Sequence, residues 1–254
     1  MPNISASVTP PRFITTLAVE TFKLRRSLAL WLALVAPLLV AIFVFFNLIR
    51  SGKPASWAMT LQMSSAIWAF FMLPMSIIAL TALLAQTEHA ARTWEYLRAL
   101  PRPRWQLYAA KAVCALALVM MMQLLLAALT PLAVLTAGWV KPSVVASGTP
   151  DMVIYLQLLG RIFLASWLLV AVQLWVALRY ISFVPALTLG IAGTFFAVVA
   201  TSAKAGIWMP WQIPVNQLAS DPARADLTLL LGCVGGGLVF VLMLWRLSRQ
   251  ESPI

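Results

Sequence analysis

The chain has 254 residues, of which 62% are hydrophobic and only 10% are charged, and its mean hydropathy is +0.92. An ordinary soluble domain has about a quarter of its residues charged, so the composition excludes a soluble globular protein. The formal net charge of +11 could indicate nucleic acid, but the basic residues flank apolar stretches instead of forming a stripe on a soluble face. We therefore expect a lipid bilayer, and no nucleic acid, as the partner.

The number of charge-free runs gives the expected number of membrane spans, because a helix needs roughly 20 mostly apolar residues to cross the bilayer core. There are six, at 27–49, 54–87, 112–140, 162–178, 180–203 and 227–245. The fourth is short, and extending it upstream to Ile154 places Arg161 inside it. Stretches such as LALWLALVAPLLVAIFVFF are apolar on every face, unlike the alternating strands of a membrane barrel. The sequence predicts an all-α integral membrane protein with six transmembrane helices.

The whole chain, 1–254, is expected to be one transmembrane domain. Residues 1–27 would form a cytoplasmic tail with an interfacial helix, 28–247 the six-span bundle and 248–254 a second tail. We expect no cleavable signal peptide, because some 26 mixed residues precede a first span that is longer than a signal h-region.

The basic residues predict the orientation. With six spans, both termini share a side, and twelve basic residues lie there: Arg12, Lys23, Arg25, Arg26, Arg92, Arg98, Arg102, Arg104, Lys111, Arg179, Arg246 and Arg249. The other side has five: Arg50, Lys53, Lys141, Lys204 and Arg224. Both termini are therefore predicted to be cytoplasmic.

The segment before the first span, PRFITTLAVETFKLRRS, is moderately amphipathic. On a helix it places Phe13, Leu17, Thr21 and Leu24 on one side and turns Lys23 and Arg26 away. This pattern is typical of a helix on the membrane surface, although the segment could instead continue the first span.

The segment EHAARTWEYLRALPRPRWQLYAAK, between the second and third runs, contains most of the charge in the middle of the chain. From Thr87 to Leu100 it reads as a helix with one apolar stripe and one charged stripe. Pro101 ends the helix, because the residue before a proline is pushed out of helical geometry. Such a surface helix could transmit force, accept a partner, or simply lie at the interface.

Several polar groups fall within the predicted spans. Arg161 could bind an anionic substrate group, pair with another helix or reach the surface, and Gln62, Gln123, Gln157 and Gln173 would by default bond between helices. Cys114 and Cys233 are expected to fill space, His89 to lie on the surface, and no metal-ligand set is apparent.

After the fifth run, the stretch IWMPWQIPVNQ clusters Trp208, Pro210, Trp211 and Pro214. Tryptophan prefers the headgroup level and proline breaks helices, so we expect short broken segments at the outer interface, sheltered by protein. This stretch is a candidate outer gate.

The central segment resembles the signature between the second and third spans of ABC-2 type exporter permeases, in particular the lantibiotic-immunity and bacitracin-resistance group. The matching residues are Glu88, Trp94, Leu97, Leu100, Pro101, Arg104, Tyr108 and Lys111. The layout and the PW…P stretch agree more weakly, and the PRPR corner departs from the pattern.

The resemblance implies that the segment contains a coupling helix that contacts a separate ATPase subunit through Glu88, Arg92, Trp94, Glu95, Leu97, Arg98 and Pro101. It also implies a second permease copy, or a related one, in a bacterial inner membrane, with an amphipathic or antimicrobial-peptide-like substrate. Arg161, Gln62, Gln123 and Gln173 would line the path.

The sequence has no phosphate-binding G-x-x-x-x-G-K-[ST] motif, because Pro54 follows Gly52-Lys53 and Asn47 occupies the position of the first glycine. We therefore expect no catalytic site, with ATP and Mg²⁺ on the partner. The alternatives are a six-span scaffold or assembly factor that does not transport and, less favoured with only seven acids and one histidine, a membrane-embedded enzyme.

Overall fold

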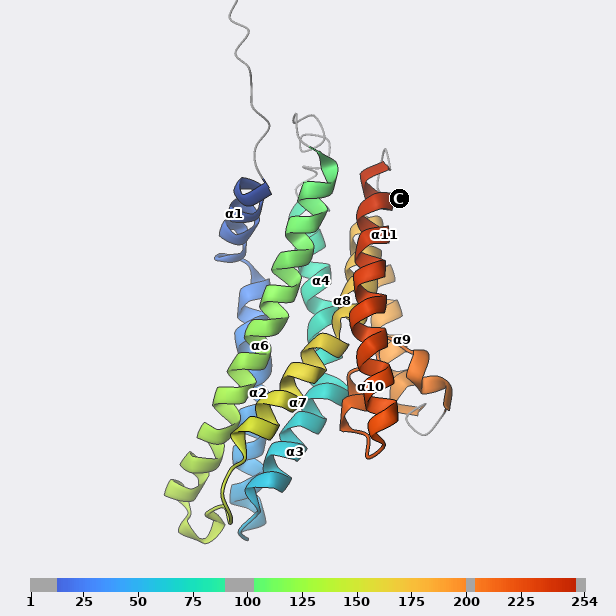
Figure 1. The fold of residues 1–254 in the computed structure, drawn as a ribbon. Helices are drawn as coiled ribbons and strands as arrows, with labels where there is room; N and C mark the ends of the chain where they lie inside the picture. Colours follow the sequence, from blue (N-terminus) through green and yellow to red (C-terminus); the bar gives the residue numbers. More distant parts are fainter. Residues whose placement is uncertain (1–12, 90–102, 200–203, 250–254) are drawn as a thin grey trace, which may run out of the picture.

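The computed structural model describes residues 13–89, 103–199 and 204–249, and these residues form an elongated helical bundle (Figure 1). The α-helices are α1 (Phe13–Leu24), α2 (Leu28–Ser51), α3 (Trp57–Ile67), α4 (Leu73–His89), α6 (Arg104–Val140), α7 (Met152–Ala165), α8 (Trp167–Arg179), α9 (Val184–Val199), α10 (Pro222–Leu230) and α11 (Gly236–Arg249). Short 3₁₀ segments are η2 (Pro142–Val144), η4 (Lys204–Trp208) and η5 (Val215–Leu218), and π-helical turns are η1 (Trp68–Met72) and η6 (Leu231–Gly235).

Five helical stretches among the described residues are long and apolar enough to cross a membrane: Leu28–Ser51, Trp57–His89, Arg104–Val140, Met152–Arg179 and Pro222–Arg249. The predicted fifth span is represented by α9, which has 16 residues. At 1.5 Å per residue it is several ångströms shorter than a hydrocarbon core of about 30 Å. Six spans therefore remain a prediction, because residues 181–183 of the charge-free run are not helical and residues 200–203 lie outside the described residues.

Both chain-terminal elements lie at one end of the bundle. Helix α1 and the last turn of α11 are together at the top of Figure 1, beside the end of α4 and the start of α6. We call this the basic end. At the far end, the α2–α3 and α6–α7 connections are joined by Trp57 N–H to Ser147 O (3.2 Å) and Ser147 N–H to Ala55 O (3.0 Å).

Two spans contain a wide turn at the middle of the bundle. In η1 the N–H of Leu73 bonds to the carbonyl of Trp68, five residues earlier, directly before Pro74. Proline has no N–H and crowds the carbonyl four residues back, so the wider turn accommodates Pro74. Pro185 lies in the first turn of α9, where proline is tolerated.

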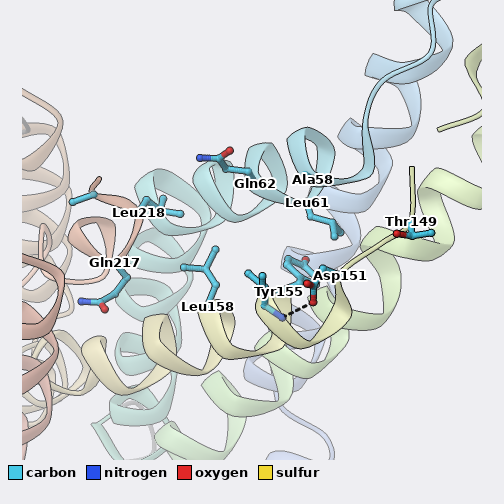
Figure 2. Close-up of a pocket in the computed structure, with 11 residues that line it drawn as sticks. Ala58, Leu61, Gln62, Thr149, Asp151, Tyr155, Leu158, Gln217 and Leu218 are labelled. Carbon is cyan, nitrogen blue, oxygen red and sulfur yellow. Dashed lines mark hydrogen bonds between the residues drawn. The ribbon is translucent and has the colours of Figure 1, made fainter. Parts of the chain in front are cut away.

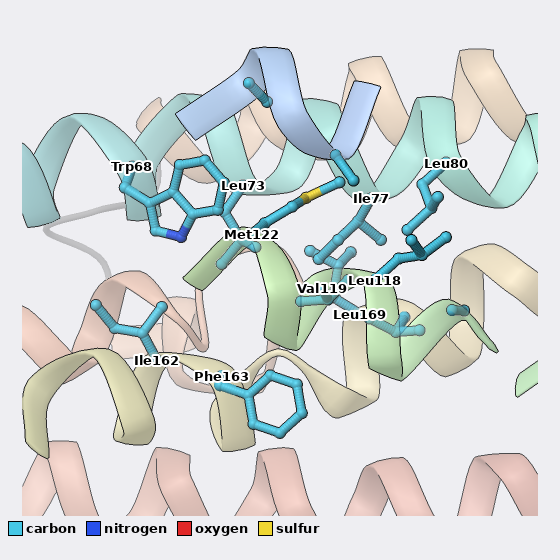
Figure 3. Close-up of a cluster of buried hydrophobic side chains, with 14 of the residues drawn as sticks. Trp68, Leu73, Ile77, Leu80, Leu118, Val119, Met122, Ile162, Phe163 and Leu169 are labelled. Atoms are coloured by element: carbon cyan, nitrogen blue, oxygen red, sulfur yellow. The ribbon is translucent and has the colours of Figure 1, made fainter. Parts of the chain in front are cut away.

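The core lies where α4, α6 and α8 meet. Trp68, Leu73 and Ile77 pack there against Met122 of α6 and residues of α7 and α8, and their side chains are fully buried (Figure 3). The outward faces of α2, α6, α9 and α11 expose large apolar side chains, as expected for helices surrounded by lipid.

Glycines allow the last span to approach the fourth closely, within this one chain. A Cβ atom added to Gly232 would lie 2.5 Å from the carbonyl oxygen of Ala165, and one on Gly236 would lie 2.7 Å from the nitrogen of Leu168. This is the point where α7 ends and α8 begins. These glycines therefore serve helix contact inside one chain, and Gly190 of α9 is similarly close to Ile78 and Gln173.

Alanine at two neighbouring glycines tests this contact. Gly236→Ala should lower the free energy of unfolding by about 1–3 kcal/mol, because the new methyl group meets backbone atoms. Gly237→Ala is the matched control: nothing among the described residues lies within 4 Å of its added Cβ, so helix propensity should leave stability unchanged or raise it. Thermal unfolding of the detergent-purified variants measures both, and equal effects would contradict the account.

Candidate functional site

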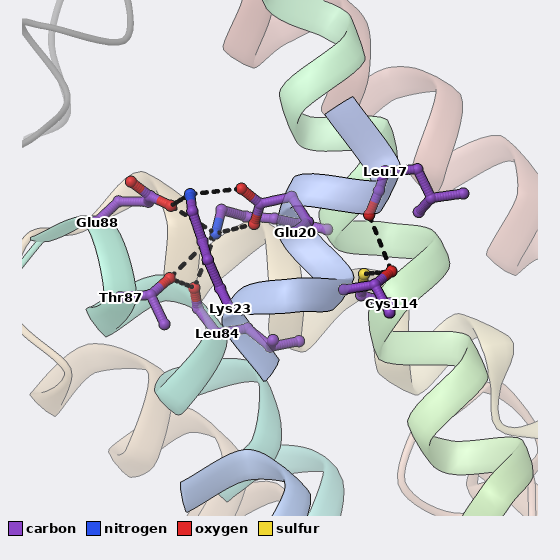
Figure 4. Close-up of polar contacts among 9 residues, drawn as sticks. Leu17, Glu20, Lys23, Leu84, Thr87, Glu88 and Cys114 are labelled. Carbon is purple, nitrogen blue, oxygen red and sulfur yellow. Dashed lines mark hydrogen bonds and ion pairs between the residues drawn. The ribbon is translucent and has the colours of Figure 1, made fainter. Parts of the chain in front are cut away.

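Four charged side chains meet inside the basic end and form what we call the ion cluster: Glu20, Lys23, Glu88 and Lys111 (Figure 4). Three separate helices contribute them. Glu20 and Lys23 come from α1, Glu88 from the last turn of α4 and Lys111 from the second turn of α6. The two acids and two lysines have no net charge when all are ionised.

Lys111 is the most deeply placed member, with 1% of its surface exposed. Its Nζ lies 2.9 Å from Glu20 Oε2 and 3.2 Å from Glu88 Oε1. It also donates to the carbonyl of Leu84 and to Thr87 Oγ1, each at 3.1 Å. A buried ammonium group is tolerated only when it is paired and hydrogen-bonded in this way.

Lys23 closes the cluster from the outside. Its Nζ lies 2.7 Å from Glu20 Oε1 and 2.8 Å from Glu88 Oε1, and its side chain is 34% exposed. Partial burial works to lower the pKa of Lys23, but its hydrogen bonds to the two carboxylates, and their charges, outweigh that effect and raise the pKa. Lys23 therefore remains charged at neutral pH.

The ion cluster corrects the predicted orientation of the N-terminal helix. The residues of α1 that face the bundle are Thr16, Glu20 and Leu24, and Lys23, expected to turn away, points into the cluster. Phe13 stacks on Trp105 of α6 with the ring centroids 6.1 Å apart. The helix is bound to α6 by polar as well as apolar contacts, because paired charges can occupy a face that hydrophobic periodicity alone would assign to solvent.

His89 is buried, 5% exposed, and its Nε2 lies 3.3 Å from the carbonyl of Ala177 in α8. The expectation of a surface histidine was wrong, because α4 continues to this residue against α8. Of the seven residues assigned to the coupling helix, Glu88 is described. Arg92, Trp94, Glu95, Leu97, Arg98 and Pro101 lie outside the described residues.

The four residues assigned to a substrate path are not gathered in one place. Gln62 of α3 lines a pocket, described below. Arg161 of α7 donates through Nε to Gln217 Oε1 at 3.1 Å and forms an ion pair with Asp226 of α10. Of the three uses that the sequence left open for Arg161, the structure shows pairing with another helix. The ion pair neutralises the arginine.

The two remaining glutamines differ from each other. The Gln173 amide nitrogen faces the carbonyl of Ala186 at 3.2 Å and its oxygen faces the N–H of Gly190 at 3.3 Å, so it connects α8 to α9 as expected of a polar group in a span. Gln123 is buried in α6, and neither amide atom has a hydrogen-bond partner among the described residues. Their role in a substrate path stays a prediction.

The stretch assigned to an outer gate is irregular and largely buried. It runs from η4 through turns to η5, which Pro214 precedes. Trp211 is 8% exposed and its ring lies where a side chain on Gly193 of α9 would be, whereas Trp208 is 68% exposed. The predicted broken, protein-sheltered segment is present, and its function as a gate remains a prediction.

These features define a helical, multi-pass membrane protein in which an N-terminal helix is fixed to the junction of the second and third spans. Comparison with protein families gives a match to the ABC-2 family transporter protein over residues 16–197, which is more than half of the chain. The chain belongs to this family of ABC-2 transporter membrane proteins, whose members are generally transport subunits without enzymatic activity and normally work with an ABC ATPase. Comparisons with curated proteins and with solved structures gave no match.

Sequence reasoning identified Glu88 and Lys111 as parts of a motif but did not pair them, and it missed Glu20. The available signal was the i, i+3 spacing of Glu20 and Lys23 on a helix with an apolar face, together with a lysine directly before the charge-free run 112–140. Together these features could have indicated a neutral cluster across three helices.

Replacing each lysine of the ion cluster by methionine should have unequal effects. Lys111→Met leaves two buried carboxylates short of a partner and should reduce the free energy of unfolding by about 3–5 kcal/mol. Lys23→Met is the matched control, and its effect should be about 1 kcal/mol or less because water reaches this side chain. Unfolding followed by tryptophan fluorescence in detergent measures the difference, and a larger loss for Lys23→Met would contradict the assignment.

The raised pKa of Lys23 predicts how stability depends on pH. A lysine whose folded-state pKa lies above its unfolded value of about 10.5 stabilises the folded state fully below that value. The stability difference between the native chain and Lys23→Met should therefore be constant from neutral pH to about pH 10 and shrink above it. A difference that disappears near neutral pH would show that Lys23 is not paired in this way.

Proposed function

We propose that this chain is the transmembrane permease subunit of an ATP-driven exporter in a bacterial cytoplasmic membrane, with the basic end and both termini in the cytoplasm. It would assemble with ABC ATPase subunits and with a second permease, identical or related. Three observations support the proposal: the family match over residues 16–197, the apolar helices, and the excess of basic residues at one end of the bundle. ATP and Mg²⁺ would bind to the partner.

The ion cluster is the observation that carries the proposal. Glu88 precedes, and Lys111 follows, residues 90–102, which include the predicted coupling helix. The two are joined across that interval by a 3.2 Å ion pair, and Glu20 connects both to α1. A push on the coupling helix would therefore be transmitted into α4, α6 and α1 together, because separating them exposes buried charge.

The proposed outer gate has polar groups that its present arrangement leaves unbonded. Both amide atoms of buried Gln212, and the Nδ2 of Asn216, have no partner among the described residues. An unmade bond of this kind costs about 1–3 kcal/mol. A second arrangement of the segment that supplied partners would be close in free energy, which is what a gate requires.

We propose that the exported molecule is amphipathic, of the antimicrobial-peptide type implied by the resemblance, and that export gives self-resistance. The half-open pocket beside Gln62, with mostly apolar walls, supports an amphipathic substrate.

Co-purification tests the exporter proposal. The chain is expressed with the ATPase encoded beside its gene, and the native chain is compared with a triple alanine variant at Trp94, Leu97 and Arg98. We expect the ATPase to co-purify with the native chain and to be reduced at least tenfold with the variant, because this helix supplies the proposed contact.

The matched control replaces the same three residue types on α11, at Leu242, Trp245 and Arg246, all of which are exposed. It should retain the ATPase, and thermal unfolding should show that both variants are folded. If no ATPase associates with the native chain, the exporter proposal is wrong and a scaffold that does not transport replaces it. If both variants co-purify equally little ATPase, the proposed coupling role of residues 88–100 is wrong.

A further inference from the structure

A half-open pocket of about 370 Å³ lies between α3, α7 and η5 (Figure 2). Its walls come from both sides of the bundle: Ala58, Leu61 and Gln62 from α3, Tyr155 and Leu158 from α7, and Leu218 from η5. The pocket lies in the half of the bundle away from the ion cluster. Its volume is within the range of small-ligand sites in proteins.

The pocket combines apolar walls with a single charge. Leu61, Leu158 and Leu218 supply apolar surface, and Asp151 is the one charged residue among those that line it. Asp151 Oδ1 accepts the N–H of Ile154 at 3.0 Å and caps α7, and its other oxygen has no partner in the described part of the chain. The nearby arginine, Arg161, does not line the pocket and is already paired with Asp226.

This charge pattern selects among amphipathic ligands. An anionic group at the rim would meet Asp151 and no free cation from the lining residues, which is unfavourable. A cationic group would meet one carboxylate, while the apolar part of the same molecule filled the space between the leucines. A neutral apolar ligand would gain nothing from Asp151.

Tyr155, which lines the pocket, has a hydroxyl that is buried in the wall. Its side chain is 3% exposed, and its hydroxyl lies beside those of Thr130 and Ser64 without a well-formed hydrogen bond to either. Thr130 and Ser64 instead bond to each other at 2.8 Å. The wall of the pocket therefore contains a buried hydroxyl whose hydrogen bonding is incomplete, which is costly in the present arrangement.

We propose that this pocket binds the apolar part of a cationic amphiphile and that Asp151 holds its positive group at the rim. The assignment rests on the exporter proposal in one respect, that the bound molecule is the transported one. Gln217 joins the pocket to the candidate gate, because it is the last residue of the IWMPWQIPVNQ stretch and also lines the pocket. It accepts from Arg161 and donates to Thr228 at 2.9 Å. Movement of η5 would therefore open or close the pocket.

Photolabelling of the full chain in phosphatidylcholine nanodiscs tests the pocket without the ATPase. The probe is dodecyltrimethylammonium with a diazirine on its chain, and the comparison probe is dodecyl sulfate with the same diazirine. We expect saturable labelling of peptides from α3 and α7 by the cationic probe, competed by unlabelled dodecyltrimethylammonium, and at least threefold less by the anionic one. Asp151→Asn retains a capping side chain and should weaken cationic labelling about threefold.

Leu158→Trp should abolish the labelling by filling the pocket. Leu156→Trp is the matched control, because Leu156 is on the same helix, is 51% exposed and does not line the pocket, and it should label as the native chain does. Labelling that is equal for both probes, or unchanged in Leu158→Trp, overturns the inference. If the chain recruits its ATPase but fails this test, only the pocket assignment is wrong. If it is labelled as expected but never recruits an ATPase, the pocket assignment stands and the exporter proposal is wrong.

Discussion

The structure depends on the need to neutralise Lys111, an ammonium group that is almost completely buried. Its charge is stable there because α1 and α4 each bring a carboxylate to within 3.2 Å and α4 adds a carbonyl and a hydroxyl. Removal of any one helix would leave charge in a medium of low dielectric constant. The cluster therefore fixes α1 to the bundle and joins the chain on either side of residues 90–102. The predicted coupling helix would thereby be connected to two spans.

The middle of the bundle has a different character. There the spans contain wide turns at η1 and η6 and a break at Ser166, and glycines bring the backbones close together. The pocket and the candidate gate lie on the side of these interruptions away from the ion cluster (Figure 1). We infer that paired charges hold the basic end rigid, whereas the packing of the far half permits more than one arrangement of its segments. A transporter needs such a division, because nucleotide-driven force must be received by one part and converted to rearrangement in another.

Much of the fold could be predicted from the sequence, because lipid imposes a simple rule on length and polarity. The charge-free runs located each long helix among the described residues, and the PW…P stretch marked a real irregularity. In the fifth run, Ile181 and Phe183 are apolar but not helical, because charge-free sequence alone does not locate where a helix begins. The site was harder to predict: Glu20 and Lys111 are 91 residues apart, and hydrophobic periodicity carries no information about which distant charges meet. The same reasoning placed His89 at the surface, although α8 covers it.

The central claim is that α1, α4 and α6 move as one body when the coupling segment is pushed. Pulsed electron paramagnetic resonance can measure this in the complex with the ATPase, with spin labels on exposed Phe22 of α1 and Met120 of α6. We predict one narrow distance distribution that is the same without nucleotide and with ADP and vanadate, and that broadens in Lys111→Met. A shift or broadening on nucleotide binding in the native chain would show that α1 moves independently and would contradict the account.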